Sequence, residues 1–155
     1  MSTNLLMSSV FRIGADKTLI VKGRRFPVST LHLAMCSPVF AAMFESDMKE
    51  KCEDEIEIKD VESSEHFAEF LRALSPSEQF LPNRKIYSSF NKLFRYNFFV
   101  LASNVLAICE LANRFQVGTL LKKCERILGN CFEIPFSERF LFADKHSLKG
   151  LMVTF

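Results

Sequence analysis

The sequence predicts a mostly helical α+β fold, in which a small three-stranded sheet packs on a cluster of about five to seven helices. Two short extended runs flank Gly23, an alternating run follows at 55–60, and the later periodic segments have helical spacing. The 155 residues are 48% hydrophobic, which suits one packed domain. A net charge of +2 is too small to indicate a polyanionic partner for the whole molecule.

The first two strands form a predicted hairpin. TLIVK at 18–22 is apolar and β-branched, and RFPVS follows at 25–29 after Gly23. Pro27 lacks a backbone N–H, so the second strand is expected at a sheet edge.

Two helices are expected next. STLHLAMC at 29–36 begins with Ser29 or Thr30 as N-cap. Ser37-Pro38 then starts a second helix, because serine caps well and proline fits the first helical turn. Its sequence VFAAMF is wholly apolar, so we expect it to be buried.

The third strand and the next helix follow a charged stretch. EIEIKD alternates, with Ile56 and Ile58 on one face. Ser63 can cap a helix at 64–74, which Pro76 ends. Its apolar stripe comprises Phe67, Phe70, Leu71 and Leu74.

The last third of the chain is predicted to form further helices. Ser103 or Asn104 is expected to cap a helix that reaches about Phe115, with Val105, Ile108, Ala112 and Phe115 on one face. Thr119 is expected to cap the next, with Gly129 at its C′ position and Leu120, Cys124, Ile127 and Leu128 inward. Ser137 and Ser147 are expected to start two shorter helices.

The sequence contains no pattern typical of an enzyme. The five glycines form no phosphate-binding loop, and no nucleophile has a visible base. His32 and Cys36 stand at i and i+4 but lack a third metal ligand, so a packed core pair is expected. We therefore expect no catalytic, cofactor-binding or metal site.

The cysteines indicate a reducing compartment. Five cysteines without a CxxC pair suit neither a disulfide framework nor a zinc site, so we expect a cytoplasmic or nuclear protein. The N-terminus lacks the pattern of a signal peptide, and no run is long enough to span a membrane.

Residues 17–44, KTLIVKGRRFPVSTLHLAMCSPVFAAMF, resemble the opening of a BTB (also called POZ) domain. EIEIKDVESSEHFAEFLRAL at 55–74 is similar to the third strand and following helix of that family, and 106–128 to its paired C-terminal helices. The segment 137–152 resembles the helical extension of nematode MATH-BTB proteins. The resemblance implies an N-terminal segment at 1–15, a BTB domain at 16–130 with an atypical insert at about 79–100, and a truncated extension at 131–155.

The resemblance implies a protein–protein interaction module that forms a homo- or hetero-dimer with BTB proteins and recruits a cullin scaffold for substrate ubiquitination. The alternative is a self-associating scaffold or transcription-linked dimer without cullin binding. No MATH domain, kelch repeat or zinc finger is visible, and neither nucleic acid nor membrane is expected as a partner. The implied partner-binding residues are Met43, Phe44, Met48, Glu50, Leu74 and Phe80, and the implied dimer surface comprises Leu31, Leu33, Met35 and Val39.

One segment departs from the family pattern. RKIYSSFNKLFRYNFFV at 84–100 holds six aromatic and four basic residues, and no acid occurs between Glu78 and Glu110. Three interpretations stay open: a nucleic-acid-binding strip, an added helix or strand with an apolar stripe, and translated non-coding sequence. The segment lies beside the expected cullin surface and could block it.

Overall fold

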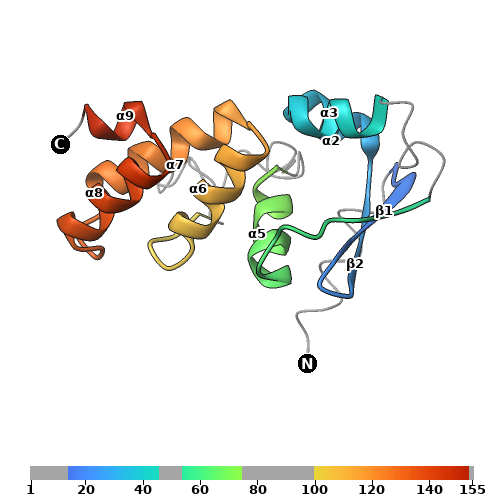
Figure 1. Ribbon diagram of the computed structural model, residues 1–155, viewed down its shortest axis with the longest axis horizontal. Coiled ribbons are helices and arrows are strands. Elements are labelled where there is room, and N and C mark those ends of the chain that lie inside the picture. Colours follow the sequence, from blue (N-terminus) through green and yellow to red (C-terminus); the bar gives the residue numbers. More distant parts are fainter. Residues whose placement is uncertain (1–13, 46–53, 75–99, 154–155) are drawn as a thin grey trace, which may run out of the picture.

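The structure is a computed structural model, which describes residues 14–45, 54–74 and 100–153. Within these ranges it contains three strands and seven helices, so the predicted α+β fold is confirmed. The sheet and the first helices lie at one end of an elongated molecule, and the last helices lie at the other end (Figure 1).

The predicted hairpin is present. Strand β1 (Lys17–Val21) pairs antiparallel with β2 (Arg24–Val28), with Leu19 opposite Phe26. Lys22 and Gly23 form the turn with φ of 50° and 77°, a left-handed pair that suits a tight hairpin.

The third strand completes a mixed sheet. β3 (Glu55–Glu57) runs parallel to β1, and the order β2-β1-β3 places β2 at an edge, as Pro27 predicts. One face is buried against the helices through Leu19, Val21, Phe26, Val28 and Ile56. On the other face, Arg25 and Glu55 form an ion pair.

Helix α2 (Thr30–Cys36) begins as predicted. The Ser29 hydroxyl accepts a hydrogen bond from the His32 backbone N–H at 3.4 Å. Helix α3 (Pro38–Glu45) follows Ser37, as predicted. The expectation that α3 is wholly buried is wrong: Phe40 and Phe44 are buried, whereas Ala42 is exposed. Only one side of α3 contacts the core, so an apolar sequence here does not mean burial all round.

Helix α5 (Ser64–Leu74) confirms the predicted stripe. The Ser63 hydroxyl accepts from the His66 backbone N–H at 3.3 Å, and all four stripe residues are buried. The C-terminal helices are α6 (Val105–Arg114), α7 (Gly118–Asn130), α8 (Phe136–Lys145) and α9 (Lys149–Met152). Their predicted inward faces are confirmed, except that Ile127 is only half-buried. None of the helices that the structure describes has the length and apolarity needed to cross a bilayer.

Several predicted helix ends are wrong. α7 begins at Gly118, with Val117 rather than Thr119 at the N-cap position, and Gly129 lies inside it. Ser137 lies in the first turn of α8, and Ser147 precedes α9 with φ of 53°. Turns such as Phe115–Val117 close through backbone hydrogen bonds, including Val117 N–H to Ala112 O at 2.8 Å, so no capping side chain is needed.

An aromatic cluster forms the centre of the core. The Phe115 ring lies 4.5 Å from Phe40, 6.0 Å from Phe67 and 5.5 Å from Phe70, measured between ring centroids. These residues come from α3, α5 and the end of α6. The cluster therefore joins the first half of the chain to the C-terminal helices.

Candidate interaction surface

Helix α2 presents an apolar face to solvent. Leu31 and Met35, at i and i+4, expose 72% and 80% of their surface. Leu33, between them, is buried in the core, so it cannot contribute directly to the dimer surface for which it was predicted. Val39, on α3, is half-buried. Two of the four predicted dimer residues thus form the exposed face.

No charged residue occurs at 26–44, the stretch that contains α2 and nearly all of α3. Large apolar side chains exposed together on one helix are typical of interaction sites, because their contact with water is unfavourable. The exposed face of α2 is therefore suited to contact with another protein.

Three contacts fix α2 and the start of α3. The Asp16 carboxylate accepts hydrogen bonds from the backbone N–H and hydroxyl of Thr30, at 2.7 and 2.5 Å. The His32 Nε2 lies 2.7 Å from the Leu74 carbonyl oxygen at the end of α5. The buried Ser37 hydroxyl donates to the Phe115 carbonyl at 2.5 Å. The face is therefore held by both halves of the chain.

The predicted partner-binding residues are mostly in the core or outside the described ranges. Phe44 is buried and stacks on Phe40 at 5.9 Å, and Leu74 is buried at the end of α5. Met43 is half-buried. Met48, Glu50 and Phe80 lie outside the described residues, as does 84–99. A partner-binding role for this set stays a prediction, and so do the domain boundaries.

The cysteines and histidines of the described ranges form no reactive or metal-binding cluster. The His32 Nε2 and Cys36 Sγ are 3.8 Å apart, and no group of three metal-ligating side chains occurs in the described ranges. Burial raises the pKa of the Cys36 thiol. A hydrogen bond with Cys124, together with burial, raises the pKa of the Cys109 thiol far above its ordinary value. Both thiols are therefore poor nucleophiles.

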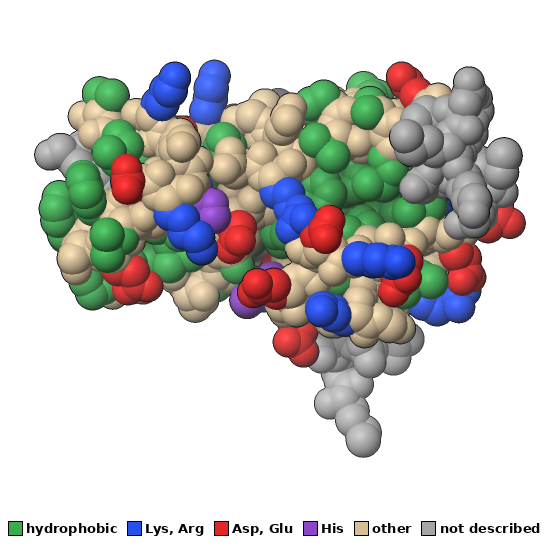
Figure 2. All heavy atoms as spheres, in the orientation of Figure 1, with side chains coloured by type: hydrophobic (Ala, Val, Ile, Leu, Met, Phe, Trp, Pro, Cys, Tyr) green, Lys and Arg blue, Asp and Glu red, His purple; other side chains and the backbone are tan. Residues whose placement is uncertain are grey.

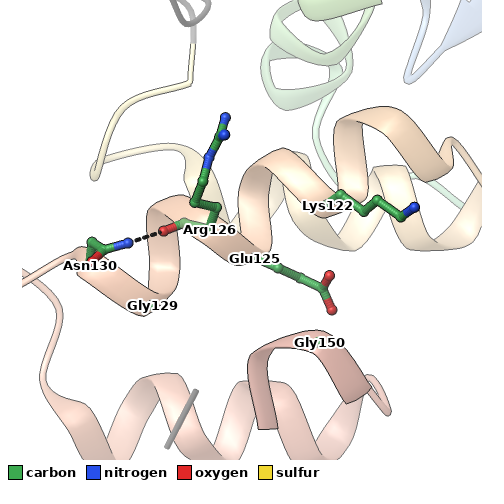
Figure 3. A pocket seen from close by; sticks show the side chains of 6 residues that line it. All are labelled: Lys122, Glu125, Arg126, Gly129, Asn130 and Gly150. Atoms are coloured by element: carbon green, nitrogen blue, oxygen red, sulfur yellow. Dashed lines mark hydrogen bonds between the residues drawn. The ribbon is translucent and has the colours of Figure 1, made fainter. Parts of the chain in front are cut away.

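A shallow pocket of about 370 Å³ lies between α7 and α9 (Figure 3). The Asn130 amide donates to the Arg126 carbonyl at 2.9 Å, and the Glu125 side chain points toward Gly150. The remaining lining residues are Lys122 and Gly129. The pocket is open, and its groups do not form a nucleophile–base pair.

A second exposed apolar region was missed by the sequence reasoning. Phe132, Phe136, Phe140 and Leu141 are all exposed on α8 and the turn before it. A signal was present, because the apolar residues at 136–143 do not fall on a single helical stripe. A helix with apolar side chains on more than one side leaves some of them in water.

A small mixed sheet, a helical cluster and an exposed apolar face define the class: a protein–protein interaction domain. The family model of the BTB/POZ domain matches residues 9–131, and the chain belongs to this family. It is a family of interaction modules rather than of enzymes, and the resemblance inferred from the sequence is confirmed.

Relatives by sequence include BTB and MATH domain-containing protein 38 from Caenorhabditis elegans. It is 27% identical over 136 residues, which cover 88% of this chain and 30% of that protein. Kelch-like protein 40 from Xenopus laevis is 30% identical over 125 residues, which cover 77% of this chain and 17% of that protein. The chain thus spans less than a third of the length of either relative.

Two solved structures share the fold. The BTB domain of zebrafish PATZ1 has a TM-score of 0.52 at 19% identity, covering 76% of this chain and 77% of that one. The BTB domain of human Gigaxonin has a TM-score of 0.51 at 17% identity, covering 77% and 81%.

Proposed function

We propose that the chain dimerises through α2 and recruits a cullin scaffold, and so acts as an adaptor for substrate ubiquitination. The observation that carries the dimer is the exposure of Leu31 and Met35 on a helix whose own sequence contains no charged residue. In a symmetric dimer the same patch faces itself across a two-fold axis, so Leu31 and Met35 of one copy meet the same apolar residues of the other.

Recruitment of a cullin scaffold is supported by the similarity of this chain to other BTB proteins. The chain is similar to BTB and MATH domain-containing and Kelch-like proteins. Its sequence at 106–128 also resembles the paired C-terminal helices of MATH-BTB proteins. The hydrogen bond between His32 and Leu74 ties α2 to the end of α5, where the expected cullin-facing segment begins. The two proposed contacts therefore share one scaffold.

The dimer is tested by sedimentation equilibrium of the wild-type chain and of Leu31→Asp/Met35→Asp. Because both side chains are already exposed, the substitutions should leave the fold intact. Buried charge at a two-fold interface should weaken dimerisation at least tenfold, since central interface residues each contribute about 1–2 kcal/mol or more. Thr119→Asp adds a charge at an exposed position on α7 and serves as control. Equal association by all three proteins would contradict the α2 interface.

The cullin contact is tested by titrating the chain with the N-terminal domain of the cullin dedicated to BTB proteins. A version that lacks 84–100 is titrated in parallel. Micromolar or tighter binding by both supports the adaptor function. Binding by the shortened version alone would mean that the insert blocks the surface. Absence of binding by two proteins that both unfold cooperatively would leave the self-associating scaffold as the function.

We propose a cytoplasmic or nuclear location for this activity. Cys36, Cys109, Cys124 and Cys131 are all free thiols in the structure, which suits a reducing compartment. Imaging of the tagged chain in cells tests the proposal, and accumulation in the secretory pathway would contradict it.

A further inference from the structure

We draw no further inference here: the strongest candidate, the exposed apolar surface of α8 at the end of the molecule away from the sheet (Figure 2), carries none, because nothing in the structure shows what covers it.

Discussion

At the scale of single residues, Ser37 contributes more than a helix cap. Its buried hydroxyl accepts from the Phe40 backbone N–H at 3.1 Å and donates to the Phe115 carbonyl at 2.5 Å. One side chain thus provides a hydrogen-bond acceptor at the start of α3 and a hydrogen-bond donor at the end of α6. A Ser-Pro pair predicts the cap from sequence, but the partner 78 positions away is set only by the tertiary fold.

We predict that Ser37→Ala lowers the free energy of unfolding by about 1–3 kcal/mol, because the Phe115 carbonyl is left buried without its donor. Urea unfolding measures the change. Ser103→Ala, at an exposed position, should change stability by less than about 0.5 kcal/mol. Equal effects of the two substitutions would mean that the Ser37–Phe115 hydrogen bond contributes nothing.

At the scale of elements, the start of α2 is held by the Asp16 carboxylate, which accepts a hydrogen bond from the Thr30 backbone N–H. Asp16 lies 14 residues before Thr30 in the sequence. Partial burial tends to raise the pKa of Asp16, but the hydrogen bonds from the Thr30 hydroxyl and N–H outweigh it and hold the pKa below its ordinary value. A carboxyl with a lowered folded pKa stabilises the protein above its unfolded pKa of about 3.9, and this stabilisation is lost as pH falls through the folded value.

Asp16→Asn should therefore destabilise the chain near neutral pH by about 1 kcal/mol or less, since the group is largely exposed. The difference from the wild type should shrink below about pH 4 and vanish once Asp16 is protonated in both states. Urea unfolding of the two proteins between about pH 7 and pH 2 measures it. A gap that stays constant across this range would exclude the charge of Asp16 as the cause.

The elements were more predictable than their ends. The stripes at 64–74 and 105–115 repeat over several turns, so many residues support each prediction. A cap depends on one or two residues, and Thr119 and Gly129 were misplaced because backbone hydrogen bonds and packing set the ends of α7. The outward Leu31 and inward Leu33 belong to the same apolar run, so sequence alone could not separate the interaction face from the core.

At the scale of the whole molecule, Phe115 joins the two halves of the chain. Its ring packs on three phenylalanines from α3 and α5, while its own backbone ends α6. Leu151 is also buried, but it lies on the four-residue α9, at the far end of the molecule from the sheet (Figure 1). Phe115 therefore contacts elements from both halves of the chain, whereas Leu151 contacts mainly the C-terminal helices.

We predict that Phe115→Ala destabilises the sheet and the C-terminal helices together, by about 3–5 kcal/mol. That is a large share of the roughly 5–15 kcal/mol that stabilises a domain of this size. Backbone amide exchange should accelerate in β1, α5 and α6 alike. Leu151→Ala should instead accelerate exchange mainly in α8 and α9, because their contacts are with each other and with α7. If Phe115→Ala left exchange in β1 unchanged, the sheet and the C-terminal helices would be separate folding units, and the core would not be the single cooperative structure that its aromatic cluster implies.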